Sequence, residues 1–230
     1  MENREDNVKN CILLFQEYRD RFAIFEQQVC AFFKNSKILN SSPFPLIHSY
    51  KSRLKDLSHL EDKLNRKWEK GEFVTPENFF QEITDLCGVR VLHLSHEQFP
   101  SIHQEIMRNI TDYKDWVLHE IPKAYIWDKE KEDIYRELGL NVQTKDSNYT
   151  SMHYVVRPNK DSFISCEIQV RTLFEEVWGE IDHEINYPHK TDSIACKEQI
   201  KVLSKLVNTG SRLADAIFIT HNDYNNSRKK

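Results

Sequence analysis

The sequence predicts an α+β fold, with a group of short strands between long helices at the two ends of the chain. Apolar residues recur at helical spacing over residues 8–34 and again over residues 194–219. Between them, residues 89–94 and 152–157 form short strand-like runs, and residues 166–171 alternate between polar and apolar side chains. These lengths and patterns are typical of strands, so helices and strands share one chain.

The composition fits one large domain or a domain with helical extensions. The chain has 230 residues, of which 39% are hydrophobic and 11% aromatic, enough to bury a core. No apolar run approaches the roughly 20 residues that span a membrane, and the polar N-terminus does not look like a secretory signal. The net charge of −4 argues against general coating of nucleic acid, although it leaves room for a local basic patch.

The cysteines and glycines narrow the class of protein further. The five cysteines are scattered without CxxC spacing, which favours reduced thiols in the cytoplasm over disulfides or a zinc site. The five glycines form neither GxGxxG nor a Walker-type loop. A nucleotide would therefore be bound by some other arrangement.

Residues 8–34 are predicted to form a packing helix, because large apolar side chains recur along it. Phe15, Phe22 and Phe25 supply much of that apolar content. The segment Asn40–Pro45, NSSPFP, is rich in residues that break helices and is expected to separate this helix from the next segment.

A basic segment runs from His48 to Gly71. Leucines spaced by three to four residues predict that its later part is helical, with a buried leucine face. On such a helix Lys63 and Lys67 lie one turn apart, and cations near a helix start suit a polyphosphate. The cations of the segment are Lys51, Arg53, Lys55, Lys63, Arg66, Lys67 and Lys70. Interspersed acids support the alternative, an ordinary solvated helix face, and the segment by itself does not decide between the two.

The stretch DLCGVRVLHL begins where a helical pattern opened by Pro76 ends. Asp85 therefore lies at a predicted helix-to-strand junction, Gly88 is a predicted turn, and residues 89–94 form the strand. An acid at such a junction commonly caps a turn, and it also suits a ligand for Mg²⁺. A second acid at Glu167 favours the metal site, because two carboxylates from separate elements can hold one divalent ion.

The stretch Cys166–Asn186 carries the most informative local pattern. Glu167, Gln169 and Arg171 alternate with apolar residues, so one face of a strand presents an acid, an amide and a guanidinium. Thr172 then begins a helix, in which a glutamate three residues later completes a capping box. Such a junction fixes a carboxylate rigidly, although a half-buried edge strand with a solvated polar face has the same pattern.

A polar loop and a strand precede this stretch, and a helix comes after it. Lys145 and Tyr149 lie in the loop, where an aromatic ring can stack on a base while a cation meets phosphate. Residues 152–157 form the strand, and a PNKD connection leads to the strand of Glu167. The closing helix at residues 194–219 has a predicted core face of Leu203, Leu206, Leu213 and Ile217.

Four blocks, taken in order, resemble the synthetase domain of the RelA/SpoT family of alarmone synthetases. The segment KSRLK…LEDKLNRK is similar to the family's ATP-phosphate helix, and DLCGVRV resembles its D-x-x-G-x-R-V turn. NYTSMH stands where the family has a guanosine loop, usually G-Y-x-S-x-H, and EIQVRT is nearly the family's E-I-Q-[IV]-R-T. The next helix, with W…DHEINY, is also similar, and together the blocks span about residues 48–190. Each block alone is weak, whereas the ordered set is specific.

The resemblance implies a nucleotidyltransferase-like synthetase domain with a mixed sheet of about five strands flanked by helices. It assigns residues 46–190 to this domain, 1–45 to an N-terminal helical extension, and 191–230 to a C-terminal helix and loose tail. The hydrolase half and the C-terminal regulatory domains of the long family members are missing, so a small single-domain synthetase is expected. Members of this size often form dimers or tetramers, so a homo-oligomer is among the expected assemblies.

The implied activity is transfer of pyrophosphate from ATP to the ribose 3′-hydroxyl of GDP or GTP, with Mg²⁺ as cofactor. In this interpretation Asp85 and Glu167 hold Mg²⁺, and Glu167 also helps to deprotonate the attacking hydroxyl. Arg53 and Arg90 sandwich the adenine, because planar guanidinium groups stack on bases. Tyr149 stacks on the acceptor guanine. The phosphates are held by Lys51, Lys55, Lys63 and Lys67. The rest of the acceptor side is lined by Lys145, His153, Gln169, Arg171 and His183.

The acceptor side departs from the family's pattern more than the ATP side does. Asn148 stands where Gly is usual, Thr150 where many members have Arg, and Glu176 where small synthetases often have Asn. Two alternatives therefore stay open: a toxin-like relative that pyrophosphorylates the 3′ end of tRNA, and a catalytically silent nucleotide-binding regulator. The net negative charge gives the first little support, and the intact pair Asp85 and Glu167 argues against the second.

Overall fold

The structure is a computed structural model that describes residues 3–127, 131–144, 150–187 and 190–228. Its strands are β1 Ser49–Leu54, β2 Cys87–His93, β3 Val117–Leu118, β4 Lys123–Ile126, β5 Asn141–Thr144, β6 Ser151–Arg157 and β7 Cys166–Thr172. Its α-helices are α1 Arg4–Asn35, α2 Leu57–Glu69, α3 Phe79–Glu82, α4 Phe99–Arg108, α5 Glu132–Glu137, α6 Leu173–Asn186 and α7 Ile194–Ser227. Two short helical turns, η1 His96–Gln98 and η2 Asn109–Tyr113, complete the set.

Over this part of the chain the strands form one mixed sheet of seven strands. The order is β1-β2-β7-β6-β4-β5, with β3 paired to β6. β2 is parallel to β7 and β4 is parallel to β5, whereas the other pairs are antiparallel. The α+β class is confirmed, but the expected count of about five strands is too low. β3 has two residues and β5 has four, too short for alternation to be recognised.

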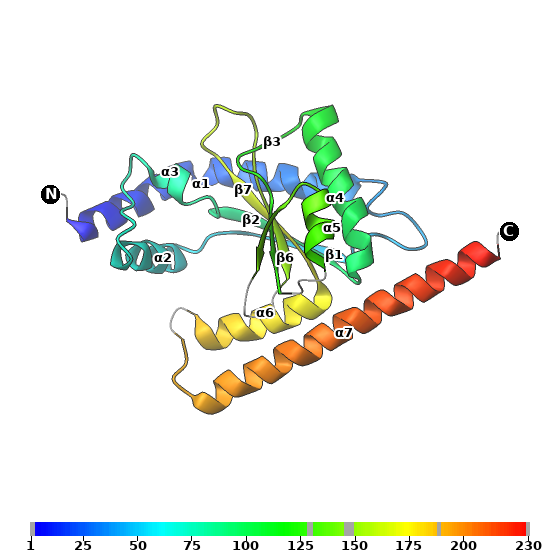
Figure 1. The fold of residues 1–230 in the computed structure, drawn as a ribbon. Coiled ribbons are helices and arrows are strands. Elements are labelled where there is room, and N and C mark those ends of the chain that lie inside the picture. Colours follow the sequence, from blue (N-terminus) through cyan, green and yellow to red (C-terminus); the bar gives the residue numbers. More distant parts are fainter. Residues whose placement is uncertain (1–2, 128–130, 145–149, 188–189, 229–230) are drawn as a thin grey trace.

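One face of the sheet is covered by helices and the other carries polar side chains. The predicted helix at residues 8–34 is confirmed as α1, which contacts β1, β2 and β7 and lies behind the sheet in Figure 1. Phe15, Phe22 and Phe33 of α1 are fully buried in the core. On β7 the apolar residues are buried while Glu167 and Gln169 are only partly buried, so they face away from α1.

The basic segment is not a single helix, because its first part forms the edge strand β1. Asp56 caps α2 by accepting hydrogen bonds from the backbone N–H groups of the first turn, so the helix begins only at Leu57. Lys51 and Arg53 therefore lie on a strand rather than near a helix start. The leucine face is confirmed in α2, where Leu60 is fully buried.

Gly88 lies within strand β2 rather than in the predicted turn. A Cβ atom at this position would stand 3.4 Å from the backbone oxygen of Glu167 on the neighbouring strand. Because it has no side chain, Gly88 allows β2 and β7 to lie close together beside Glu167.

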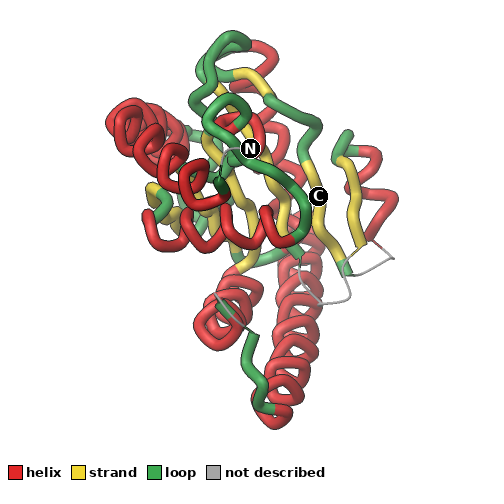
Figure 2. Tube along the Cα trace, turned by 90° about the vertical axis from the view of Figure 1, so that its left-hand side faces the viewer, coloured by secondary structure: helices red, strands yellow, loops and turns green. Residues whose placement is uncertain are grey.

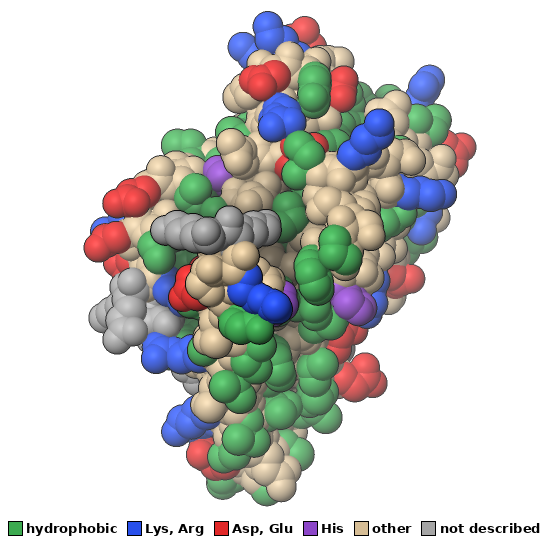
Figure 3. All heavy atoms as spheres, turned by 90° about the vertical axis from the view of Figure 1, so that its right-hand side faces the viewer, with side chains coloured by type: hydrophobic (Ala, Val, Ile, Leu, Met, Phe, Trp, Pro, Cys, Tyr) green, Lys and Arg blue, Asp and Glu red, His purple; other side chains and the backbone are tan. Residues whose placement is uncertain are grey.

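Helices α6 and α7 form a hairpin beyond one end of the strands, as Figures 1 and 2 show from two directions. The predicted core face of α7 is wrong for three of its four residues, since Leu206, Leu213 and Ile217 are 64%, 61% and 59% exposed, whereas Leu203 is half-buried. The residues that α7 buries are Ser204, Val207, Ser211 and Asp215. Hydrophobic side chains accordingly gather over the lower part of the surface in Figure 3.

Small residues explain the choice of face on α7. Gly210 lies against Phe174 of α6, and a Cβ atom at Gly210 would stand 2.7 Å from its ring. Such close contact between helices requires small side chains, so the leucines point outward. The helix has 34 residues and continues to Ser227, past the predicted end at residue 219. Among the described residues, no helix is both long and apolar enough to cross a membrane.

Candidate active site

The strand register brings the predicted residues together on the uncovered face of the sheet. Alternate residues of a strand share a face, so Glu167 and Arg171 flank Gln169 on β7. One row crosses four strands and consists of Lys51, Arg90, Gln169 and His153. The prediction that an acid, an amide and a guanidinium share one face is therefore confirmed.

Glu167 is a partly buried carboxylate with two hydrogen bonds. Nδ1 of His153 donates to Oε1 at 3.0 Å, and Nε2 of Gln169 donates to Oε2 at 2.6 Å. Burial raises the pKa of Glu167, but its partners, first His153, lower it by more, so the pKa lies below its ordinary value. The carboxylate is ionised at neutral pH and held in one orientation, as a metal ligand or general base must be.

Asp85 lies between α3 and β2 and is held by two lysines. Nζ of Lys55 lies 2.8 Å from Oδ2, and Nζ of Lys63 lies 2.8 Å from Oδ1. Burial alone would raise the pKa of Asp85, but the two cations hold it well below its usual range. Burial also lowers the pKa of Lys55, against the opposite effect of Asp85. Three elements meet at this acid, because Lys55 follows β1 and Lys63 lies on α2.

Lys67 does not join this group. It follows Lys63 by one turn of α2, as predicted, but its Nζ lies 2.8 Å from Glu72 and 3.2 Å from Glu82. The basic segment therefore directs two of its lysines to Asp85 and a third to a separate pair of acids.

The two predicted metal ligands lie on or directly before two neighbouring parallel strands, β7 and β2. Asp85 immediately precedes the first residues of β2, and Glu167 lies on β7. Burial and the hydrogen bond from His153 affect the pKa of Glu167 most, and the negative charge of Asp85 raises it as well. The two acids therefore lie within electrostatic reach of each other. Within the described residues no group of three or more His, Cys, Asp or Glu side chains is arranged to hold a metal ion by itself. Two carboxylates completed by phosphate oxygens and water suit Mg²⁺, so this donor set fits that ion.

A second group of charges surrounds Glu176 in the first turn of α6. Lys51 Nζ and Arg90 Nη1 donate to Oε1 at 3.2 and 3.0 Å, and Arg171 Nη2 lies 2.5 Å from Oε2. Arg90 also pairs with Glu180 one turn later. Burial raises the pKa of Glu176, but the cations, first Arg171 and then Arg90, bring it below its ordinary value.

Sequence reasoning marked Glu176 only as a departure from the family's pattern and missed this cluster. The signal that points to it is position: Glu176 lies in the first helical turn after the strand of Arg171. An acid placed there faces back toward the end of the strand and meets the cations of the neighbouring strands.

A cleft of about 930 Å³ opens beside these residues. Five of the predicted residues line it: Arg53, Arg90, Gln169, Arg171 and His183. Neither Asp85 nor Glu167 belongs to the lining, but Gln169 both faces the cleft and donates to Glu167. Glu167 is therefore connected to the cleft through Gln169.

Most of the other lining residues were not predicted, among them three that bring an aromatic ring or a positive charge to the cleft. Tyr187 stacks on His183 with ring centroids 4.4 Å apart, and Cζ of Arg66 lies 4.9 Å from the centroid of the Tyr187 ring. Lys197 and Lys201 enter the lining from the first turns of α7. The sequence offered no periodic signal for them, because the cleft forms only when α7 folds back along α6.

Part of the predicted acceptor side lies outside the described residues, namely Lys145 and Tyr149 with the neighbouring Asn148. Their roles stay predictions. The other four residues predicted for the acceptor side are among the described residues: His153, Gln169, Arg171 and His183. The ring of His153 meets that of Tyr125 edge-on at 4.8 Å.

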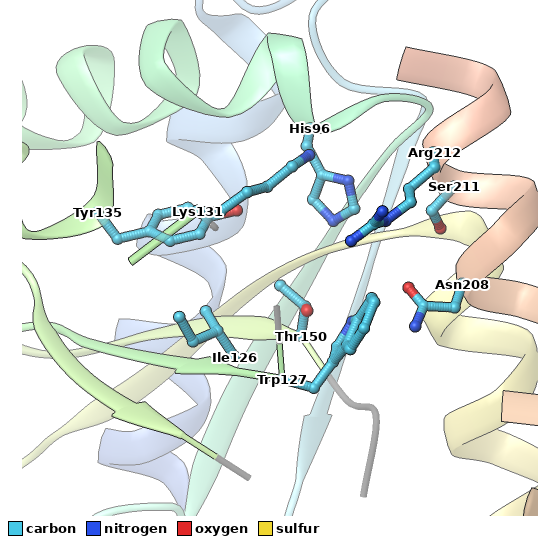
Figure 4. A pocket seen from close by; sticks show the side chains of 9 residues that line it. All are labelled: His96, Ile126, Trp127, Lys131, Tyr135, Thr150, Asn208, Ser211 and Arg212. Carbon is cyan, nitrogen blue, oxygen red and sulfur yellow. The ribbon is translucent and has the colours of Figure 1, made fainter. Parts of the chain in front are cut away.

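A small polar pocket lies on the inner side of α7, next to the start of β6 (Figure 4). Asn208 and Arg212 of α7 face Trp127 across it, with Cζ of Arg212 5.4 Å from the ring centroid. His96 and Lys131 close the opposite side. These two residues also belong to a network of ion pairs that ties α7 to the rest of the molecule.

That network is centred on His96, which lies between two buried acids. Nδ1 is 3.1 Å from Asp215 of α7, and Nε2 is 3.0 Å from Glu175 of the α6 capping box. Lys131 Nζ lies 2.6 Å from Asp215. Burial lowers the pKa of His96, but the acids, first Glu175, raise it to about 9. His96 is thus protonated at neutral pH. It links Asp215 of α7 to Glu175 in the first turn of α6, directly after the strand that carries Glu167.

Known proteins similar to this chain have the same arrangement of elements. A GTP pyrophosphokinase, YwaC, from Bacillus subtilis (strain 168) is 26% identical over 164 residues, 66% of this chain and 67% of that protein. The crystal structure of the small alarmone synthetase 1 from Bacillus subtilis matches with a TM-score of 0.64 at 17% identity, over 91% of this chain and 96% of that one.

The same synthetase was also solved with ligands. The structure bound to its product pppGpp has a TM-score of 0.62 at 18% identity, covering 91% of this chain and 95% of that one. The structure bound to AMPCPP has a TM-score of 0.62 at 16% identity, covering 91% and 96%. At these identities the matches show that the fold is shared.

The family model described as "Region found in RelA / SpoT proteins" matches residues 52–192, well over half of the 230 residues. The matched range contains Asp85, Glu167 and the cations that line the cleft from the sheet. It ends in the segment between α6 and α7. The chain therefore belongs to the RelA/SpoT family.

Proposed function

We propose that this protein transfers a pyrophosphate group from ATP to the ribose 3′-hydroxyl of GDP or GTP. The observation that carries the proposal is Glu167, oriented by its two hydrogen bonds, within electrostatic reach of Asp85 and its two lysines. A relative is named a GTP pyrophosphokinase, and a solved structure of the shared fold holds the product pppGpp. Family membership and the site geometry support the same reaction in this chain.

In the proposed reaction the acceptor's 3′ oxygen forms a bond to the β-phosphorus of ATP. The bond between that phosphorus and the α,β-bridging oxygen breaks, and AMP leaves. The hydroxyl proton passes to Glu167, which accepts it late because a ribose hydroxyl is a far weaker acid than a carboxylic acid. The hydrogen bond from His153 keeps the accepting oxygen in place.

Charge neutralisation supplies most of the remaining catalysis. Lys55 and Lys63 lie at Asp85 and are positioned to meet the phosphates of ATP. Arg53 lines the cleft and presents a planar guanidinium to the adenine. Held by Asp85 and Glu167, Mg²⁺ would neutralise phosphate oxygens and lower the pKa of the hydroxyl.

The test is a transfer assay with the purified protein. ATP labelled in its β and γ phosphates is incubated with Mg²⁺ and with GDP, GTP or deacylated tRNA in parallel. Label in a 3′-pyrophosphorylated guanosine nucleotide supports the proposal, and loss of that product in Glu167→Gln assigns it to this site. Label at the 3′ end of tRNA with none on GDP or GTP would replace the acceptor, and no transfer to any acceptor would reject the proposed enzyme.

A further inference from the structure

Glu176 is the residue at which the proposed donor and acceptor sides meet. Its Oε1 accepts from Lys51 and Arg90, which are assigned to ATP, and its Oε2 lies against Arg171 on the acceptor side. The side chain of Glu176 is only 6% exposed. A single buried carboxylate thus joins cations from three neighbouring strands, β1, β2 and β7.

The carboxylate and Arg171 are held in place more firmly than the other partners. Glu176 follows the capping box of α6, in which the side chains of Thr172 and Glu175 bond to each other's backbone N–H groups. Arg171 is packed under Gly179, where a Cβ atom would stand 2.8 Å from its Nη1. Glu176 therefore stays beside Arg171 while its contacts on Oε1 change.

The two donor-side cations are freer to move. The side chain of Lys51 is 62% exposed on the edge strand β1, and that of Arg90 is 22% exposed in the wall of the cleft. Carboxylate and phosphate oxygens take hydrogen bonds from the same N–H donors with the same geometry. A polyphosphate bound beside Arg90 in the cleft wall and Lys51 on β1 would therefore compete with Glu176 for the N–H donors of these two cations.

Resting on the proposed function, we infer that Glu176 is a positioning carboxylate that holds Lys51 and Arg90 until ATP displaces it. The affinity for ATP is then the difference between the contacts that the nucleotide gains and the ion pairs that it breaks. This makes Glu176 an internal competitor that weakens donor binding in the free protein. A neutral residue at the same position would leave both cations available.

Glu180 offers a matched control within the same cluster. It also pairs with Arg90, but its side chain is 55% exposed and it forms no ion pair with Lys51 in the described part of the chain. An exposed acid of this kind competes weakly, because water already screens its attraction. Removing its charge tests whether any neighbouring acid has the effect or only the buried one.

The experiment is calorimetric titration of AMPCPP, with Mg²⁺, into the wild-type protein and the variants Glu176→Gln and Glu180→Gln. Glu176→Gln is expected to bind AMPCPP about tenfold more tightly, and Glu180→Gln at most about threefold more tightly. In the transfer assay the KM for ATP is expected to fall in Glu176→Gln by more than kcat changes, which a loss of structure would not produce.

Equal or weaker AMPCPP binding by a folded Glu176→Gln protein would overturn the inference, because a carboxylate that merely orients Arg90 predicts weaker binding. Thermal melting shows whether the variant folds. If Glu176→Gln does not fold, the variant Glu176→Asp is titrated instead. This protein is expected to bind AMPCPP about threefold more tightly than the wild type, because the shorter side chain forms weaker ion pairs with both cations. Failure of the wild-type protein to bind AMPCPP at all would reject the ATP site itself and hence the proposed function.

Discussion

Glu167 and Glu176 lie nine residues apart on one strand and helix, yet their surroundings differ in kind. Glu167 meets an imidazole and an amide, whereas Glu176 meets a lysine and two arginines. The imidazole and the amide orient the carboxylate of Glu167 through hydrogen bonds, and neither lysine nor arginine pairs with it among the described residues. Cations cancel the charge of Glu176, so the acid acts mainly on the cations themselves.

Asp85 combines features of both acids. It is a proposed metal ligand like Glu167, but two lysines already lie against it. In the proposed reaction Lys55 and Lys63 turn toward phosphate, which leaves the oxygens of Asp85 to the metal ion. The three acids thus differ in how many lysines and arginines pair with them among the described residues: none at Glu167, two at Asp85 and three at Glu176. Removing the charge of each acid tests what these partners change.

The largest effect is expected from Glu167→Gln, which keeps the shape of the side chain but removes its charge. The transfer rate should fall by about 10³-fold or more, because both metal ligation and proton acceptance are lost. Initial rates of labelled product measure the change. Glu180→Gln, which removes an exposed acid from the same segment, should keep most of the rate. A Glu167→Gln protein with more than a tenth of the wild-type rate would contradict this role.

Asp85→Asn is expected to lower the rate by about 10²-fold and to raise the Mg²⁺ concentration required for half-maximal rate. It also leaves the buried ammonium of Lys55 without its acid partner, at a cost of a few kcal/mol in the free energy of unfolding. Rates over a Mg²⁺ series and urea denaturation measure the two effects. A loss of stability with an unchanged Mg²⁺ requirement would show that Asp85 only holds the lysines.

Glu175, the neighbour of Glu176, extends the comparison, because the positive charge of its partner His96 can be removed by raising the pH. His96 has a pKa of about 9 in the folded protein, above its ordinary value of 6.5. The stabilisation by Glu175 and Asp215 is therefore complete below about pH 6.5 and is lost as the pH rises through about 9. The free energy of unfolding should fall by roughly 2 kcal/mol over this window, and Glu175 and Asp215 are the partners responsible.

Denaturation of the wild-type protein and of His96→Gln between pH 6 and 10 measures this effect. The variant should be less stable at pH 6 and nearly as stable as the wild type at pH 10. Parallel curves for the two proteins would show that the network does not tie α7 to the molecule through a charged His96.

The fold was predictable wherever the signal is local. The alternation around Glu167, the capping box after Thr172 and the phenylalanines of α1 each depend on neighbours in the sequence, and all three are confirmed. The face that α7 buries was not predictable, because it is chosen by the contact of Gly210 with Phe174 and not by hydrophobicity. A regular leucine pattern records which side of a helix is apolar, not whether another element covers it.

The site was predictable residue by residue but not in its connections. Asp85 and Glu167 could be proposed from separate motifs, and in the structure Asp85 lies two residues before β2, the strand that runs parallel to the strand of Glu167. Which lysine reaches which acid depends on side chains from α2 and α3, so the turn of Lys67 away from Asp85 had no sequence signal. The cluster of Glu176 likewise exists only after three strands align.

The smallest effect is expected from a substitution of Arg53, one of the two arginines assigned to adenine. Like Glu167 and Glu176, the two arginines differ in their charged partners. Arg90 is tied to Glu176 and Glu180, whereas Arg53 is exposed in the cleft wall and forms no ion pair within the described residues. A free guanidinium contributes through its flat face, at about 1 kcal/mol for a stacked contact of this kind. Arg53→Ala should therefore raise the KM for ATP about fivefold with little change in kcat. Arg53→Lys should be as impaired as Arg53→Ala, because a lysine restores the charge but not the plane. Recovery of the wild-type KM by lysine would instead assign Arg53 to the phosphates, where charge matters and the flat face does not.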